Sequence, residues 1–275
     1  MTQSMKNLII DFSIKQLGFD ECRFTSAYLD DIDSYKEWLS NNYHGSMGYL
    51  KKHLPLKEDP TKVLDNVQSA IVVIKNYKNT TKQFLDDEQK VARYALGHDY
   101  HDVIMKKLEN IISFIKKYDS SINCYPSVDR RPVAERCLAL QAGIGFRGKN
   151  TLVIHPTLGS YFFIGVILTT YDFKIDTPLH MHCGNCRKCI DACPTGALTN
   201  DTFDARKCIS YLTTHRKKPL LEKELKTFNG WIYGCDCCQE VCPYNSDTPL
   251  TDWKEFWPVK SKKERDCFGH FVPSQ

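Results

Sequence analysis

CGNCRKCIDACP, at residues 183–194, places its cysteines with the spacing C-x2-C-x2-C-x3-C-P, which bacterial ferredoxins use to hold four-iron clusters. Three thiolates at three-residue intervals can wrap a tight loop around one cubane cluster. The fourth, Cys193, is carried away by the start of a helix and, in two-cluster proteins, binds the other cluster. Pro194 ends the loop because it has no backbone N–H to donate. This stretch predicts a ferredoxin-like fold in the C-terminal part of the chain.

A second run, CDCCQEVCP at residues 235–243, has the same ending but lacks one upstream cysteine. Cys208 can take that place. The crossed pattern of two-cluster ferredoxins then predicts two [4Fe-4S] clusters. The first would bind Cys183, Cys186, Cys189 and Cys242, and the second would bind Cys193, Cys208, Cys235 and Cys238. Cys237 is left over and is expected to form a wall of a site.

Structural zinc is the main alternative for paired cysteines, but one zinc needs only four ligands and does not explain two matched Cys-Pro endings. A disulfide framework is disfavoured because nine of the 13 cysteines fall between Cys183 and Cys242 and because the N-terminal sequence, which reaches Asp11 early, lacks a secretory signal. Clustered thiols in a reducing compartment indicate redox or metal chemistry. Four isolated cysteines are expected to be small buried residues, namely Cys22, Cys124, Cys137 and Cys267.

The bulk composition is that of an ordinary globular protein of 275 residues, with 42% hydrophobic and 25% charged residues. A formal net charge of +4 permits a polyanionic partner without requiring one. The longest apolar stretch, 161–168, is much shorter than the ~20 residues that cross a bilayer. We therefore expect no membrane partner and a cytoplasmic location.

The first 175 residues have a mixed α/β pattern. Apolar spacing predicts helices at 6–17 and 101–118, the first ending at Gly18. Short apolar runs predict strands at 70–74, 151–154 and 161–169, the last two joined by a turn at 156–159. The composition changes at 176–182, where we place a boundary before a cluster domain at 176–245. The tail, 246–275, holds Trp253, Phe256 and Trp257 and is expected to pack on the body.

The sequence Gly143-Ile-Gly145-Phe-Arg-Gly148 matches the dinucleotide-binding pattern G-x-G-x-x-G only formally. That pattern functions between a strand and a following helix. Here a helix is expected before it, at 132–141 with Pro132 in the first turn, and a strand after it. We instead predict a turn whose backbone closely approaches a bulky ligand.

Asp129, in Val128-Asp129-Arg130-Arg131-Pro132, allows two interpretations. It could cap the following helix or pair with an arginine, which the spacing favours. It could also donate a proton beside a cofactor, which would require burial to raise its pKa. The stretch 93–101 is similarly open, because its tyrosines and histidines could line a pocket or only anchor a turn.

These stretches together resemble epoxyqueuosine reductases, the cobalamin-dependent iron–sulfur family of tRNA modification. The shared residues are Gly18-Phe-Asp20, His44-Gly-Ser-Met47, Tyr94–His101, Asp129–Asn150, His155-Pro with Gly159-Ser160, and both cysteine runs. The resemblance implies a nitroreductase-like α/β cobalamin-binding domain at 1–175 followed by the ferredoxin-like domain. The D-x-H-x-x-G cobalt-ligand motif is absent, which suits a cofactor without a histidine ligand from the protein.

The resemblance also implies a reaction, in which the epoxide oxygen of epoxyqueuosine at the wobble position of tRNA leaves as water. The clusters would pass single electrons to cobalamin, and Asp129 would donate a proton. The expected partners are a tRNA with a queuosine-type anticodon, specific for Asp, Asn, His or Tyr, and a low-potential electron donor. A monomer is expected. The implied cobalamin contacts are Tyr100, His101, Asn150, Ser160, Ser210, Asp236 and Cys237.

Two basic segments are candidates for tRNA phosphates, His215-Arg-Lys-Lys218 and Lys260-Ser-Lys-Lys263. Many relatives continue into a C-terminal helical-repeat domain, whereas this sequence stops at Gln275, so we expect a short form. The alternatives are a cobalamin enzyme like the reductive dehalogenases, a ferredoxin-type electron carrier without its own substrate, and a zinc-bearing tRNA-binding module.

Overall fold

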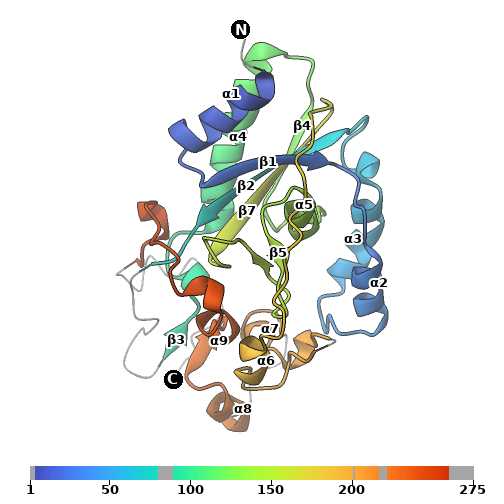
Figure 1. Cartoon of the computed structure of the whole chain (residues 1–275). Coiled ribbons are helices and arrows are strands. Elements are labelled where there is room, and N and C mark those ends of the chain that lie inside the picture. The colour runs from blue at the N-terminus through green and yellow to red at the C-terminus, as the bar shows by residue number, and fades with distance from the viewer. Residues whose placement is uncertain (1–3, 80–88, 201, 217–221, 260–275) are drawn as a thin grey trace.

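A four-stranded antiparallel sheet with the order β1-β2-β7-β4 forms the centre of the protein (Figure 1). The structure is a computed structural model that describes residues 4–79, 89–200, 202–216 and 222–259. The strands are β1 (Glu21–Ser26), β2 (Ser69–Asn76), β7 (Phe162–Thr169) and β4 (Cys124–Ser127). The strands expected at 70–74 and 161–169 are confirmed, and they are direct neighbours, with Ala70 opposite Leu168.

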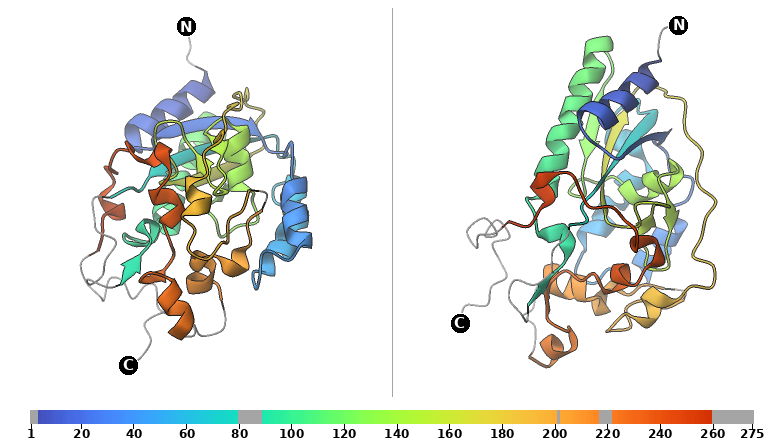
Figure 2. Two further views of the ribbon diagram at one scale, coloured as in Figure 1. Left: turned by 60° about the horizontal axis from the view of Figure 1, so that its bottom comes forward. Right: turned by 60° about the vertical axis from the view of Figure 1, so that its left-hand side comes forward.

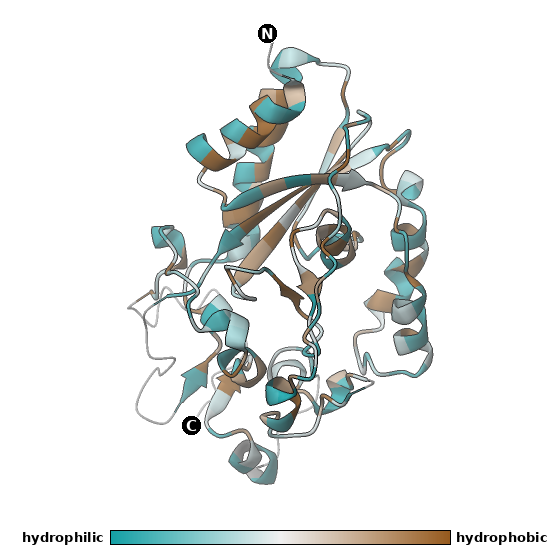
Figure 3. Cartoon of the chain, viewed as in Figure 1, coloured by the Kyte–Doolittle hydropathy of each residue, from teal (hydrophilic) through white to brown (hydrophobic). Residues whose placement is uncertain are grey.

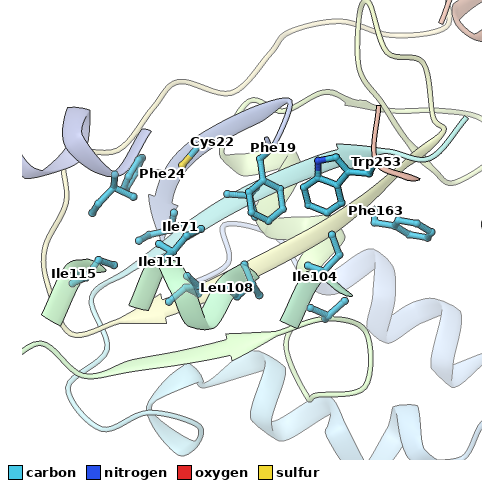
Figure 4. Packing of buried hydrophobic residues seen from close by; sticks show 14 of the residues in the cluster. Phe19, Cys22, Phe24, Ile71, Ile104, Leu108, Ile111, Ile115, Phe163 and Trp253 are labelled. Atoms are coloured by element: carbon cyan, nitrogen blue, oxygen red, sulfur yellow. The ribbon is translucent and has the colours of Figure 1, made fainter. Parts of the chain in front are cut away.

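Two helices cover one face of this sheet (Figure 2). They are α1 (Met5–Asp11), which continues as a π-helical turn to Gln16, and α4 (Tyr100–Tyr118). Gly18 follows with φ +80°, a backbone angle that favours glycine and stops the helix. The periodicity of α4 sets its buried side, because four residues at spacings of four, three and four are 0% exposed: Ile104, Leu108, Ile111 and Ile115. These side chains meet Ile71 and Phe24 of the sheet (Figure 4).

The other face packs against α5 (Glu135–Gln141), whose Leu138 and Ala139 are buried with Val72 and Val166. Helices α2 (Asp33–Ser40) and α3 (Tyr49–Glu58) run beside this layer, and a short 3-10 turn at Pro60–Lys62 follows them. Because both faces are covered, every residue of β2 is buried. Hydrophobic residues accordingly fill the central strands (Figure 3).

The cysteine-rich part is a set of short helices at one end of the sheet (Figure 1). They are α6 (Lys188–Asp191), α7 (Ile209–Thr214), α8 (Glu222–Thr227) and α9 (Cys237–Glu240), with 3-10 turns at Ala205–Lys207 and Pro243–Asn245. Its strand β8 (Trp231–Tyr233) pairs in parallel with β3 (Lys90–Val91). A 3-10 turn at Arg93–Ala95 follows β3. The N-terminal part of the chain therefore completes a two-stranded sheet of the cysteine-rich part.

The segment after Asn245 returns to the first core. Trp253 and Phe256, the latter in a 3-10 turn at Lys254–Phe256, are 7% and 2% exposed and join the cluster under α4. Phe19 lies against Trp253, with ring centroids 5.3 Å apart (Figure 4). Lys75, only 1% exposed, forms ion pairs with Asp20 and Asp252. Residues 260–275 of the expected tail lie outside the described residues.

Two expected boundaries were wrong, both next to the glycine-rich stretch. Helix α5 begins at Glu135 and not at Pro132, because Val133 closes a tight turn on Arg131 and Ala134 has a non-helical ψ of 64°. The strand expected from Thr151 begins only at Val153, because Thr151 has φ +66°. This strand, β6 (Val153–Ile154), pairs with β5 (Phe146–Arg147).

The glycines of that stretch approach the chain itself. A Cβ atom at Gly143 would meet the backbone carbonyl of Thr177, and one at Gly145 would meet that of Ile154. The protein's own backbone therefore accounts for the need for glycine at these two positions, and a close approach of this turn to a bulky ligand stays a prediction. The nitroreductase-like detail of the N-terminal domain stays a prediction.

Candidate functional site

Asp129 lies in the loop between β4 and α5, in a left-handed backbone conformation with φ +54°. Glu135, in the first turn of α5, fixes this loop. Its Oε1 atom accepts hydrogen bonds from the Ser127 hydroxyl at 2.6 Å and from the Asp129 backbone N–H at 3.1 Å. Burial raises the pKa of Glu135. Sequence reasoning missed this residue, although an acid six positions after Asp129 in a helical first turn was a usable signal.

The N-terminus of α4 brings Tyr100 and His101 to Asp129. The Tyr100 hydroxyl donates to Asp129 Oδ2 at 2.9 Å, and His101 Nε2 lies 3.8 Å from the same oxygen. Asp99 caps the helix, accepting from the His101 backbone N–H, and its Oδ1 lies 2.6 Å from His101 Nδ1. Arg130 Nη2 donates to the other Asp99 oxygen at 2.7 Å. His101 thus stands between two carboxylates.

The charges of this group shift two pKa values in opposite directions. The contact with His101, helped by the hydrogen bond from Tyr100, outweighs burial and lowers the pKa of Asp129 to about 2. Burial lowers the pKa of His101, but the contacts with the Asp129 and Asp99 carboxylates outweigh it and the net pKa is raised. Asp129 is therefore ionised at neutral pH, contrary to the expectation that burial raises its pKa. Its side chain is 74% exposed, and the rise in pKa that burial would cause is outweighed by these contacts.

Residues of three further elements lie close enough to Asp129 to feel its charge. Tyr49 of α3 and Tyr94 both have pKa values raised by burial and, to a smaller extent, by the Asp129 charge. Lys57 of α3 and His215, just after α7, have pKa values lowered by burial, which the Asp129 charge opposes. Sequence reasoning missed Tyr49 and Lys57, because nothing local links α3 to a loop some 70 positions later. Groups from α3, α4 and the end of α7 thus gather around an exposed carboxylate.

The first set of cysteines surrounds one pocket. A pocket with about 370 Å³ of empty volume, part of it open to solvent, is lined by the four predicted ligands of the first cluster, Cys183, Cys186, Cys189 and Cys242. The β5–β6 hairpin forms another wall, because Phe146 and Ile154 pack against Cys242. Tertiary structure therefore joins the first cysteine run to the last cysteine of the second.

The second set also converges, as the mutual influence of its thiols shows. Burial raises the pKa of Cys238, and Cys208 and Cys193 raise it further. Burial raises the pKa of Cys208, with a contribution from Cys193. Cys235 has a raised pKa through Cys237 and burial, with a further contribution from Cys238. Helix α6, which holds Cys189 of the first set, packs against α9, which holds Cys238 of the second.

Cys237 lies on the apolar side of this second set. The Trp231 indole Nε1 donates to its sulfur at 3.2 Å, and the side chain packs against a cluster that includes Ile209 and Phe228. The hydrogen bond with Cys235 lowers the pKa of Cys237 to about 7. This environment suits the expected wall position, while its contact with cobalamin stays a prediction.

Two other predicted cobalamin contacts have their polar groups engaged within the protein. The Ser160 hydroxyl donates to Gln239 at 2.9 Å and accepts from Asn245 at 3.0 Å. Asp236, 1% exposed, accepts from the Arg93 backbone N–H at 2.8 Å. Ser210 lies in the first turn of α7. Cofactor contacts by these residues stay predictions.

All twelve cysteines of the described residues are free thiols. Cys22 is buried as expected, and burial raises its pKa to about 12, whereas Cys124 and Cys137 are partly buried. Cys267 lies outside the described residues. Across the described part of the chain, no three His, Cys, Asp or Glu side chains are arranged to hold a single metal ion.

The basic segments are only partly covered by the structure. Arg216 forms an ion pair with Glu224 at 2.7 Å. Lys217, Lys218 and the segment 260–263 lie outside the described residues. Among the helices that the structure does describe, none has the length and apolar character needed to span a membrane.

Two family models match this chain. Residues 182–245 match the 4Fe-4S double cluster binding domain, and residues 57–130 match the model described as epoxyqueuosine reductase QueG, DUF1730. The first match covers all eight predicted cluster ligands. The second ends just after Asp129 and includes the α4 residues that contact it.

Individual relatives agree with these matches. The epoxyqueuosine reductase of Leadbetterella byssophila is 37% identical over 251 residues, which cover 90% of this chain and 82% of that protein. The structure of the Bacillus subtilis epoxyqueuosine reductase, with its catalytic aspartate loop swung out of the active site, has a TM-score of 0.82 at 30% identity and covers 97% of this chain and 76% of that one. A further epoxyqueuosine reductase structure, bound to an epoxyqueuosine-modified tRNA-Tyr stem loop, has a TM-score of 0.80 at 31% identity with the same coverage. The chain therefore belongs to the epoxyqueuosine reductase family.

Proposed function

We propose that this protein reduces epoxyqueuosine to queuosine at the wobble position of tRNA. Support comes from the names of relatives that cover most of the chain and from the relative that holds an epoxyqueuosine-modified tRNA stem loop. Removing the epoxide oxygen as water consumes two electrons and two protons and leaves a carbon–carbon double bond. The protein must therefore supply electrons and protons at one place.

One tyrosine connects the two groups that would do so. The Tyr94 ring lies 6.5 Å from that of Tyr100, which holds Asp129. Tyr94 also packs against an apolar cluster around Trp231, and Cys235 and Cys237 pack against the same cluster. The proposed proton donor is thus linked to Cys235 and Cys237 through Tyr100, Tyr94 and the apolar cluster that Tyr94 and these cysteines share. This juxtaposition is the observation that carries the proposal.

Asp129 and His101 are proposed to act as one proton-donating unit. Asp129 is ionised at neutral pH and His101 holds a proton more strongly than an ordinary histidine. A substrate that covers Asp129 would remove it from water and raise its pKa, which would draw a proton from His101. Asp129 then donates to the departing oxygen. In the structure of the Bacillus subtilis relative, the loop of the catalytic aspartate is swung out of the active site. This supports the proposal that the Asp129 loop moves between a position in which Asp129 receives a proton and one in which it donates the proton.

Two [4Fe-4S] clusters require eight thiolate ligands, which these eight cysteines can supply. We propose the crossed ligation given above, in which each of the two sets of thiols binds one cluster. Cobalamin is proposed from the family resemblance. When bound, it would supply a cobalt centre that exchanges single electrons with the clusters. The exposed Asp129 carboxylate is accessible to a large ligand, with Tyr100, His101 and Cys237 as its proposed contacts. Ser160, Ser210 and Asp236 are the other proposed contacts, whereas Asn150, also predicted, lines the first thiol pocket.

The proposed partners are a tRNA with a queuosine-type anticodon and a low-potential electron donor. We further propose that the protein acts as a monomer in the cytoplasm. Cationic side chains would bind the phosphates, which makes binding weaker at higher salt.

The test is nucleoside analysis of tRNA from cells that lack the protein. We expect epoxyqueuosine to accumulate and queuosine to return when the wild-type gene is restored. Queuosine at normal levels in the deletion strain, in the absence of a second reductase, would refute the proposed function. Reconstituted protein should convert epoxyqueuosine-tRNA in the presence of cobalamin and a low-potential reductant, and conversion without cobalamin would remove that cofactor from the proposal.

A further inference from the structure

Asn150 has a buried amide nitrogen without a partner. The residue is 5% exposed, and its Nδ2 atom has no hydrogen bond among the described residues. Unpaired buried donors are rare in proteins because losing water without gaining another acceptor is costly. The side chain lines the first thiol pocket together with Cys183, Cys186, Cys189 and Cys242. An acceptor for this donor is therefore expected inside the pocket.

The orientation of this amide is fixed by its oxygen. Asn150 Oδ1 accepts from the Leu152 backbone N–H at 3.3 Å, and only an oxygen can take that role. Gly148 leaves room for it, because a Cβ atom there would come within 2.5 Å of Asn150 Oδ1. Since the oxygen points into its own turn, the nitrogen is on the opposite side of the amide. Its two hydrogens are free to point toward the pocket.

The preceding residue holds the cysteine loop against the same turn. Lys149 Nζ donates to the backbone carbonyls of Gly184 at 2.8 Å and Cys186 at 3.0 Å. A positive charge is thereby placed at the rim of the first pocket. Two consecutive residues of the β5–β6 turn therefore direct a cation and a neutral donor at one thiol set.

We propose that Asn150 Nδ2 donates a hydrogen bond to a sulfur of the first cluster and raises the reduction potential of that cluster. Reduction adds one negative charge to the cluster, and a hydrogen bond to sulfur stabilises the more negative form. Asn150 is thus a positioning and tuning residue of the electron path rather than a contact of cobalamin. The assignment rests on the iron–sulfur part of the proposed function and is independent of its tRNA substrate.

The direct test uses the reconstituted wild-type chain labelled with ¹⁵N at asparagine side-chain amides. Pulsed EPR of the reduced protein should show a ¹⁵N coupling and an exchangeable-proton coupling at the first cluster. That cluster is identified as the signal lost in Cys242→Ala. Absence of an asparagine nitrogen coupling in the wild type overturns the proposal, whatever the variants do.

A redox titration gives the second measurement. Asn150→Ala should lose the ¹⁵N coupling. At a fixed potential, its ratio of reduced to oxidised first cluster should fall on the order of tenfold, which corresponds to a midpoint potential lower by about 59 mV for one electron. The second cluster is the internal reference and should not shift. The matched control is Asn185→Ala, since Asn185 lies in the same cysteine loop but is exposed. An unchanged first-cluster midpoint in an iron-replete Asn150→Ala protein refutes the tuning role. If the ¹⁵N coupling and the midpoint shift are both observed but the wild-type protein does not convert epoxyqueuosine-tRNA, the proposed function is refuted and the tuning role of Asn150 is not.

Discussion

The phenolic oxygen of Tyr100 lies 2.9 Å from a carboxylate oxygen of Asp129, although the two residues are 29 positions apart. Both residues lie at one end of the sheet. Helix α4 packs along β7, and β4, which is the neighbour of β7, leads into the Asp129 loop near the start of α4. The Tyr100 ring is itself held by Phe163 of β7, with stacked centroids 4.1 Å apart. The core of the protein thus sets the position of the donor that holds Asp129.

Replacing Asp129 by Asn should slow reduction of epoxyqueuosine-tRNA by roughly 10²- to 10⁴-fold, because a positioned acid contributes about that much to proton transfer. Binding of cofactor and iron content should be unchanged. The measurement is single-turnover conversion at saturating reductant. Asp102→Asn is the matched control, since Asp102 is an 81% exposed acid in the first turn of the same helix. Equal rates for Asp129→Asn and the wild type would leave Asp129 as a structural residue.

The same substitution should lower the pKa of His101. The wild-type pKa lies above the ordinary value of 6.5, because the nearby Asp129 and Asp99 carboxylates raise it against burial. Because the folded-state pKa is raised, the imidazolium stabilises the folded protein fully below pH 6.5, and this contribution is lost as the pH rises through the folded-state pKa. Histidine NMR titration checks the shift. A His101 pKa that is unaffected by Asp129→Asn would show that the 3.8 Å contact carries no electrostatic coupling.

Single cysteine replacements should separate the two clusters. The wild type should bind about eight iron atoms per chain, and Cys242→Ala or Cys193→Ala should each reduce this to about four, by removing different clusters. EPR of the reduced proteins should show the loss of different signals in the two variants. Cys237→Ala should retain about eight iron atoms, as should the control Cys124→Ala. Loss of iron in Cys237→Ala would make that residue a ligand and overturn the crossed assignment.

Removing the Asn245 side chain should weaken the docking of the cysteine-rich part onto the sheet. Its oxygen accepts from the Ser160 backbone N–H at 2.7 Å, and its nitrogen donates to the Gln239 carbonyl at 2.7 Å. Asn245→Ala leaves the Ser160 N–H buried without a partner, while the Gln239 carbonyl keeps only its bond from the Cys242 N–H. The free energy of unfolding should therefore fall by roughly 1–3 kcal/mol. Anaerobic urea denaturation followed by circular dichroism measures this loss. Exposed Asn200→Ala should change the free energy by less than about 0.5 kcal/mol, and an equal effect of both variants would refute the interpretation.

Much of the architecture could be predicted from local patterns. The spacing of Ile104, Leu108, Ile111 and Ile115 predicted α4, because a helix repeats every 3.6 residues. The expected end of the first helix at Gly18 was correct, because a positive φ suits glycine. Errors arose where a special backbone angle at Thr151 or a tight turn before Glu135 overrode the local pattern.

The sequence by itself determined which residues can bind iron, since ligand spacing within a loop of about ten residues is a local property. Only tertiary structure decided that His101 holds Asp129 ionised and that Asn150 turns an unpaired donor toward the first thiol set. Ser160 and Asp236 were likewise engaged by distant partners. The physical reason is that a pKa and a hydrogen bond depend on distances between atoms, and these distances are set by the packing of segments far apart along the chain.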